Sequence, residues 1–318
     1  MQNFLDPAIL FFVFGLLAGA LKSNLEIPAP IARFLSLYLL MALGLKGGFA
    51  LAKSGLTPEV VLSLGCALLM AVVVPALGYV LLQRWVSRFD AAALSATYGS
   101  VSAVTFITAT QYLDNHGLAF GGHMAAAMAL MESPAIIMAV LLANLARQRE
   151  GRAGEGHSLK AVMHESLTDG AQLLLLGAMG VGLLTGASGE AAMKPFAGDL
   201  FKGMLAFFLL DMGLLAARNL GSLRGESPRL LAYALLAPPV HASLALGLAV
   251  LTGLSAGNGA LLMVLAASAS YIAVPAVVRI AIPEARPALY FGMSLGLTFP
   301  LNILVGIPVY VRVAQQVL

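Results

Sequence analysis

Long apolar stretches follow one another along almost the whole chain, and they constrain its fold more than any other feature. Each is close to the length of about 20 residues that an α-helix needs to cross a lipid bilayer. In order, the predicted spans are 5–21, 29–51, 57–83, 91–113, 118–146, 168–187, 195–217, 229–253, 258–280 and 288–312. We therefore predict an all-α integral membrane protein with ten transmembrane helices.

The composition agrees with this class. Hydrophobic residues make up 60% of the 318 residues and charged residues 10%, whereas soluble proteins have about 45–50% and about 25%. The single cysteine, Cys66, allows no intrachain disulfide. No HExxH or phosphate-loop motif occurs. We expect neither an enzyme nor a cofactor, and no nucleic-acid partner, because the basic residues form short clusters between apolar runs.

The placement of the basic residues also orients the predicted spans. Most of the 18 Lys and Arg residues lie in the connections at one face of the membrane. The positive-inside rule makes that face cytoplasmic. An even number of spans then places both termini outside, in the inner (plasma) membrane of a bacterium.

The longest polar stretch divides the spans into two sets of five. We predict a first repeat over 1–146, a cytoplasmic linker over 147–167 and a second repeat over 168–318. Because five is odd, similar halves would be inverted, as in many secondary transporters. Landmarks that recur in order are Pro75 with Pro238, Leu43-Gly44-Leu45 with Met212-Gly213-Leu214, Ser100-Val101-Ser102 with Ser268-Ala269-Ser270, and Pro134 with Pro300.

Spans four and nine carry small hydroxyl residues at their centres, where breaks would expose backbone N–H groups. The positive dipole ends of the second half-helices would then cross at the membrane midplane and form an anion site. Tight packing through small residues is the alternative, but recurrence in both halves favours a transport site. The predicted substrate-binding residues are Gly99, Ser100, Val101, Ser102, Ser268, Ala269, Ser270 and Tyr271.

An ionisable residue inside a membrane span is a functional candidate by default. Glu132 precedes Pro134 in span five, and its repeat mate is Thr298 in span ten, followed by Asn302. Carboxylate, hydroxyl and carbonyl oxygens are ligands for hard cations. The predicted sodium ligands are Glu132, Ser102, Ser270, Thr298 and Asn302, with structural capping as the alternative.

Lys46 in span two and Asp211 in span seven are the other deep charges. They are candidates for an ion pair or a conformational latch. Alternatively, Lys46 extends to the membrane interface.

Several of these segments, in this order, resemble the sodium-dependent bicarbonate transporter family first defined in cyanobacteria. The motifs are Leu43-Gly44-Leu45-Lys46-Gly47-Gly48, Gly99-Ser100-Val101-Ser102, Glu132-Ser133-Pro134-Ala135, Glu165-Ser166-Leu167, Ala237-Pro238-Pro239-Val240-His241, Ala266-Ala267-Ser268-Ala269-Ser270 and Gly296 to Pro300. The resemblance implies a mobile core and a gate domain in an elevator-type homotrimer, with bicarbonate beside sodium where the broken helices cross. It also implies a PII-like cytoplasmic regulator.

The chain departs from this family pattern at two places. Tyr271 follows Ser270 where members of the family have an acidic residue, and the linker lacks their long acidic insert. Sodium-coupled import of bicarbonate is the leading hypothesis. The alternatives are sodium-coupled transport of another small organic anion, with Tyr271 shaping the pocket, and a membrane sensor that binds a PII-like partner.

Overall fold

The computed structural model describes residues 6–150, 158, 160, 163–164 and 168–318, and these contain helices and no strand. The elements are α1 (Pro7–Ala20), α2 (Ala29–Ser54), α3 (Pro58–Leu82), α4 (Arg88–Gly99), α5 (Ala103–Asn115), α6 (Met124–Arg149), α8 (Gly170–Met193), η3 (Lys194–Asp199), α9 (Phe201–Leu220), η4 (Gly221–Leu223), α10 (Pro228–Thr252), α11 (Ala256–Ala267), α12 (Ala273–Ala281), α13 (Pro287–Phe291), η5 (Gly292–Thr298), α14 (Phe299–Leu301), η6 (Asn302–Gly306) and α15 (Ile307–Val317).

Seven helical segments in the described part of the chain are long and apolar enough to cross a membrane. They are Ala29–Ser54, Pro58–Leu82, Arg88–Asn115, Met124–Arg149, Gly170–Leu223, Pro228–Thr252 and Pro287–Val317. The Gly170–Leu223 segment covers the sixth and seventh predicted spans. Two shorter apolar helices, Pro7–Ala20 and Ala256–Ala267, lie in the first and ninth. The predicted class, an all-helical multi-pass membrane protein, is confirmed.

Local sequence explains where several helices begin. Proline is the first residue of α1, α3 and α10, a position where its missing N–H costs nothing. The Asp6 carboxylate caps α1 by accepting from the N–H of Ala8 at 2.8 Å.

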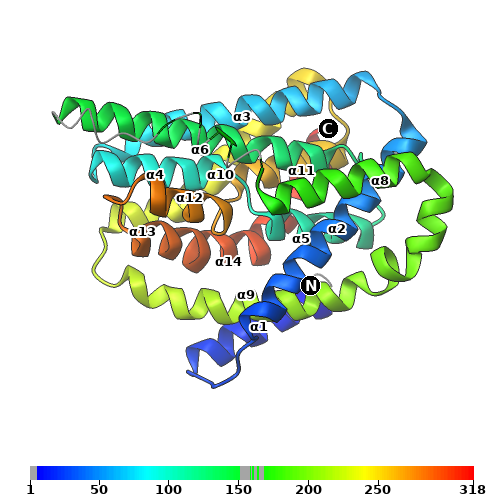
Figure 1. Cartoon of the computed structure of the whole chain (residues 1–318), viewed down its shortest axis with the longest axis horizontal. Helices are drawn as coiled ribbons and strands as arrows, with labels where there is room; N and C mark the ends of the chain where they lie inside the picture. Colours follow the sequence, from blue (N-terminus) through cyan, green and yellow to red (C-terminus); the bar gives the residue numbers. More distant parts are fainter. Residues whose placement is uncertain (1–5, 151–157, 159, 161–162, 165–167) are drawn as a thin grey trace.

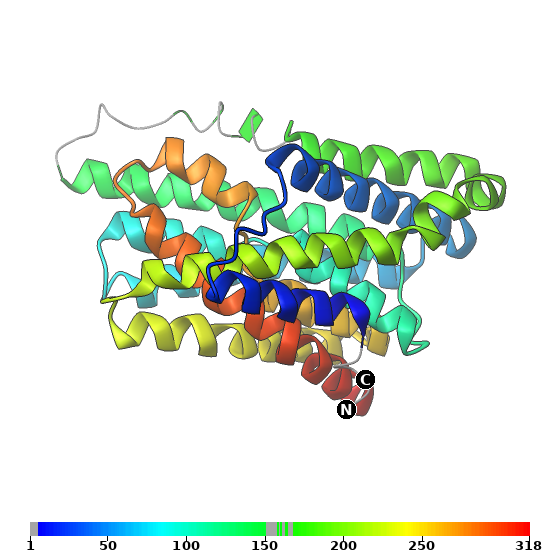
Figure 2. The same ribbon diagram turned by 90° about the horizontal axis from the view of Figure 1, so that it is seen from below.

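Glycines bring two pairs of helices into close contact. In one pair, a Cβ atom on Gly15 of α1 would lie 2.3 Å from a backbone carbonyl oxygen of α9. In the other, a Cβ on Gly48 of α2 would lie 2.1 Å from a carbonyl oxygen of α8. Such small-residue contacts are typical of membrane helices. Since α2 also packs on α9, we call α1, α2, α8 and α9 the four-helix group. Figure 2 shows α1 beside α9 and α2 beside α8.

Apart from η3, which packs on α2, α8 and α9, the remaining helices form a second group, which we call the core. Its helices α3, α4, α6 and α10 lie together in the upper part of Figure 1. Two predicted spans are broken within it. The fourth is interrupted between Gly99 and Ala103, and the ninth between Ala267 and Ala273. Both breaks fall on the small hydroxyl segments where the sequence predicts them.

The predicted linker over 147–167 lies largely outside the described residues. The helix before it, α6, continues to Arg149, and the next long helix begins at Gly170. The Glu165-Ser166-Leu167 motif also lies outside the described residues.

Candidate functional site

The two helix breaks contact each other directly. The backbone N–H of Ser270 donates to the carbonyl oxygen of Thr97 at 2.8 Å. In the opposite direction, the N–H of Ser102 donates to Oγ of Ser268 at 3.0 Å. All of these groups are buried. The backbone N–H groups of Ser102 and Ser270, which lie between two half-helices, are therefore satisfied by the other break, as buried polar groups require.

Each break is followed by a half-helix with a first-turn N–H group that donates to a serine hydroxyl of the break. Oγ of Ser102 accepts from the N–H of Thr105 at 3.2 Å, at the start of α5. Oγ of Ser270 accepts from the N–H of Val274 at 3.2 Å, at the start of α12. The first N–H groups of a helix have no partner within it and carry the positive end of its dipole. The N-terminal ends of α5 and α12 therefore lie close together in the core.

A cavity of about 210 Å³ lies at these half-helix starts. The two segments 101–104 and 270–273, which contain the breaks' last residues and the first residues of α5 and α12, form part of its lining. Glu132 of α6 contributes a carboxylate to the same lining. Ser36 of α2, together with Asp169 and Gln172 on the side of α8, completes its polar lining.

Glu132 is half-buried, and its carboxylate is bound from the four-helix group. Nε2 of Gln172 donates to Oε2 of Glu132 at 2.9 Å. Neither Gln172 nor Asp169 is among the site residues predicted from the sequence. The only feature of the sequence that points to them is their position at the start of an apolar span. In the described residues, no three His, Cys, Asp or Glu side chains cluster as a metal site, so a cation here would need hydroxyl, amide or backbone oxygens as well.

The structure divides the predicted substrate-binding residues into two sets. Val101, Ser102, Ser270 and Tyr271 line the cavity. The Tyr271 ring packs edge-on against Phe299, with the ring centroids 5.1 Å apart. Behind the lining lie the remaining predicted residues, Gly99, Ser100, Ser268 and Ala269, all buried.

Gly99 and Ser268 have clear packing and bonding roles there. A Cβ on Gly99 would lie 2.6 Å from the ring of Pro75. The Ser268 hydroxyl donates to the carbonyl oxygen of Leu265 at 2.8 Å while accepting from the other break. These residues support the cavity rather than line it.

Two of the predicted sodium ligands lie outside the cavity. Oγ1 of Thr298 donates to the carbonyl oxygen of Ala234 at 2.7 Å. Nδ2 of Asn302 donates at 2.8 Å to the carbonyl oxygen of Ala267, the last residue of α11. Both side chains thus bond to helix carbonyls in this conformation. Glu132, Ser102 and Ser270 are the predicted ligands that the structure brings together.

The described residues do not bring Lys46 and Asp211 into contact. Nζ of Lys46 lies 3.9 Å from Oδ2 of Asp114 on α5 and 4.2 Å from the ring centroid of Phe201. Asp211 is buried on α9. The ion pair of Lys46 therefore joins the four-helix group to the core.

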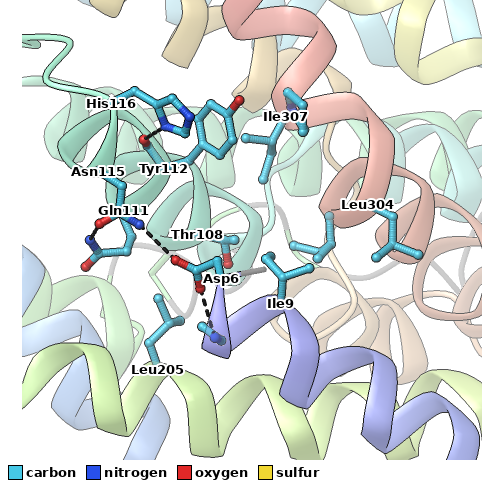
Figure 3. A pocket seen from close by; sticks show the side chains of 13 residues that line it. Asp6, Ile9, Thr108, Gln111, Tyr112, Asn115, His116, Leu205, Leu304 and Ile307 are labelled. Carbon is cyan, nitrogen blue, oxygen red and sulfur yellow. Dashed lines mark hydrogen bonds between the residues drawn. The ribbon is translucent and has the colours of Figure 1, made fainter. Parts of the chain in front are cut away.

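A second cavity, of about 320 Å³, lies at the end of α5, where Gln111 and Asn115 form part of its lining together with Asp6. Figure 3 shows Asn115 of α5 donating to Asp6, which precedes α1 (Nδ2 to Oδ2, 2.9 Å), and accepting from Gln111 (2.9 Å). Nζ of Lys202 on α9 also donates to Oδ1 of Asn115, at 3.0 Å. The end of α5 is thus bonded to α9 and to the start of α1.

Two matched bonding arrangements hold the broken helices in place. Beyond α5, the N–H of Gly121 donates to Oδ1 of Asn258 on α11 at 2.7 Å. Nδ2 of Asn258 in turn donates to Oε1 of Glu59 on α3 at 2.9 Å. The loop after α5, the second half-helix of the fourth predicted span, is thereby tied to α11, the first half-helix of the ninth.

The corresponding loop beyond α12 is held by charged residues. The N–H of Arg286 donates to Oδ1 of Asp90 on α4 at 2.8 Å, and its Nη1 donates to Oε1 of Glu226, before α10, at 2.9 Å. Arg147 adds a buried ion pair: it is 2% exposed and lies 2.7 Å from Glu284. The Nη2 atom of Arg147, which makes this ion pair, also donates to the carbonyl oxygen of Ala281, the last residue of α12, at 3.0 Å.

Comparison with known proteins identifies the family. Among curated protein sequences, no match was found. The sequence profile of the Na⁺-dependent bicarbonate transporter superfamily matches residues 7–315, which is nearly the whole chain and includes both breaks, Glu132 and the cavity lining. The chain therefore belongs to the Na⁺-dependent bicarbonate transporter superfamily.

Proposed function

We propose that this protein is a secondary active transporter that couples the inward movement of sodium to import of bicarbonate. One observation carries the proposal: the starts of α5 and α12 and the carboxylate of Glu132 line a single cavity. A dipole-bearing helix start favours an anion, whereas a carboxylate with neighbouring hydroxyls favours a hard cation. The cavity therefore offers adjoining sites for two ions of opposite charge.

Adjoining sites explain coupling. Bicarbonate oxygens would accept from N–H groups at the starts of α5 and α12, while Na⁺ would bind near Glu132, Ser102 and Ser270. Unit charges of opposite sign attract by about 4 kcal/mol at 4 Å when the effective dielectric constant is about 20. Without sodium, the Glu132 carboxylate would instead repel the anion. Each ion thus favours binding of the other, and neither binds well alone.

The helix contacts support an inverted repeat of ten spans, with halves at 1–146 and 168–318. A Cβ on Gly15 would approach the Leu210 carbonyl of α9, just as a Cβ on Gly182 would approach the Leu45 carbonyl of α2. Exchanging the two halves therefore converts the α1–α9 contact into the α8–α2 contact. The matched arrangements at Asn258 and Asp90 follow the same exchange.

On this basis we propose an elevator movement. The four-helix group would act as the gate domain, and the core would carry the cavity between the two faces of the membrane. Our proposal also includes location in a bacterial inner membrane with both termini outside, as the distribution of basic residues predicts. It further includes a homotrimer and a PII-like cytoplasmic regulator, as the family resemblance implies. The protein would have no catalytic activity and would need no cofactor other than the coupling ion.

A second candidate function keeps this fold and replaces bicarbonate by a small organic anion. It is favoured by the volume of about 210 Å³, more than bicarbonate requires, and by apolar side chains such as Val101, Ile136 and Ile272 in the lining. Acetate or pyruvate would then compete strongly with bicarbonate for uptake. The sensor alternative instead predicts no concentrative uptake of any anion, and loss of function when the linker is removed.

Uptake of labelled bicarbonate into proteoliposomes tests the proposal. At a pH where bicarbonate predominates over CO₂, an inward sodium gradient should drive accumulation, and Glu132→Gln should abolish it. Glu190→Gln is the matched control, because Glu190 pairs with Lys53 at 2.6 Å and does not line the cavity. Equal uptake with and without sodium would contradict sodium coupling.

A further inference from the structure

We infer that Gln172 is a positioning residue for the cation site: from α8 it holds the Glu132 carboxylate in place, so that sodium affinity depends on contact between the four-helix group and the core. This inference rests on the proposed function. It assigns a role in ion binding to a residue that does not belong to the broken helices.

The hydrogen bond between the two residues crosses between the two groups of helices. Gln172 lies in the first turn of α8, which packs on α2 through the close approach of Gly48 and Gly182. Glu132 lies on α6, which packs with α3 and α4 in the core. Nε2 of Gln172 is 2.9 Å from Oε2 of Glu132, and Gln172 is only 7% exposed.

The chemistry of the pair fixes the orientation of the Gln172 amide. An ionised carboxylate has acceptors only, so the NH₂ group must face Glu132 and the amide oxygen must point elsewhere. The backbone is fixed too, because Oδ1 of Asp169 accepts from the N–H groups of Ala171 and Gln172 at 3.0 and 3.1 Å. Gln172 is thereby held at both its backbone and its side chain.

This arrangement gives Gln172 an effect on cation binding. A carboxylate held by a fixed donor is already oriented when the cation arrives, so less conformational freedom is lost on binding. If the core moves relative to α8, the hydrogen bond breaks and Glu132 loses this donor. Sodium would then bind the two conformations with different affinities, which is the condition for an ion to shift a conformational equilibrium.

Substitution of Gln172 by methionine tests the inference, because methionine has a similar shape but no donor. Ordering one rotamer-rich side chain before a ligand arrives changes a binding constant by roughly twofold to tenfold. In proteoliposomes, the half-saturating sodium concentration for bicarbonate uptake should rise by about that factor in Gln172→Met. The KM for bicarbonate at saturating sodium should stay unchanged.

Gln111→Met is the matched control, since Gln111 is also a buried glutamine with an amide hydrogen bond, to Asn115 at 2.9 Å. Gln111 lines the second cavity and not the one at the breaks. Its substitution should leave the half-saturating sodium concentration unchanged. Gln172→Asn, whose side chain is one methylene shorter, should behave like Gln172→Met.

A binding measurement on the purified protein separates positioning from folding. Sodium that binds the native state raises the unfolding temperature in a concentration-dependent way, and Gln172→Met should need roughly twofold to tenfold more sodium for the same rise. The inference is wrong if Gln172→Met lowers maximal uptake but changes neither the half-saturating sodium concentration for uptake nor the sodium dependence of the unfolding temperature. Absence of any sodium effect in the wild type would overturn the proposed function and, with it, this inference.

Discussion

The ion pair between Arg147 and Glu284 gives the sharpest stability prediction. Arg147 is 2% exposed and donates from Nε and Nη2 to both carboxylate oxygens, at 2.9 and 2.7 Å. Its guanidinium also bonds to Asn144 and to the carbonyl of Ala281. Glu284→Met leaves this cation buried without its counter-charge.

Removing one partner of a buried ion pair costs about 3–5 kcal/mol. At roughly 2 °C per kcal/mol, the unfolding temperature of the purified Glu284→Met variant should fall by about 6–10 °C. The double variant Arg147→Met/Glu284→Met should lose less than Glu284→Met alone, because apolar replacement of a whole buried pair is often neutral. Thermal unfolding followed in detergent measures all three proteins.

The exposed pair of Lys53 and Glu190 serves as the control. Its side chains are 61% and 44% exposed, and surface pairs contribute about 0–1 kcal/mol. Glu190→Met should therefore shift the unfolding temperature by no more than about 2 °C. The reasoning fails if Glu284→Met behaves like Glu190→Met, or if the double variant loses at least as much as Glu284→Met alone.

Three further predictions concern the breaks and the helix contacts. Ser102→Ala removes the N-cap of α5 and Ser270→Ala removes the acceptor of the Val274 N–H, each at a cost of about 1 kcal/mol, and both should weaken the apparent affinities for bicarbonate and sodium; unchanged uptake kinetics in both variants would contradict the site. Gly48→Val should abolish folded protein on size-exclusion chromatography, whereas Gly180→Val should not, since a Cβ on Gly180 meets no atom within 4 Å; equal yields would refute the packing argument. Tyr271→Phe should keep the unfolding temperature, because the buried hydroxyl has no hydrogen-bond partner among the described residues; a large drop would reveal one.

Helix positions and helix breaks are the features that sequence predicts well here. Hydropathy alone locates the spans, because the bilayer fixes the length of an apolar run. The breaks are predictable because two segments of the same character, at Ser100–Ser102 and Ser268–Ser270, recur in both halves of the chain. One such segment alone would have indicated only close helix packing.

Contacts between distant helices are not predictable in this way. The partner of Glu132 is Gln172, which a reading of single spans treats as part of a helix start. Similarly, Lys46 pairs with Asp114 and not with Asp211. Which residues of two helices meet depends on crossing angle and rotation, and these follow from glycine contacts such as Gly48 with Gly182 rather than from periodicity within one span.

Thr298 and Asn302 illustrate the same limit. Their oxygens suit a cation, but in the structure their donors bond to carbonyl groups of α10 and α11. A hydroxyl or amide near a helix end can either bind a cation or donate a hydrogen bond to a helix carbonyl, and residue type does not distinguish these two roles. Only the position of Ala267, at the end of α11 beside Asn302, shows which use applies in this conformation.

Reciprocal coupling is the central claim, and it is tested most directly by sodium uptake in response to bicarbonate. In proteoliposomes without a sodium gradient, an inward bicarbonate gradient should drive accumulation of labelled sodium, because coupling between two binding sites acts equally in both directions. Glu132→Gln should remove this response, while Glu190→Gln should retain it. Bicarbonate entry that is fast but carries no sodium would contradict the account.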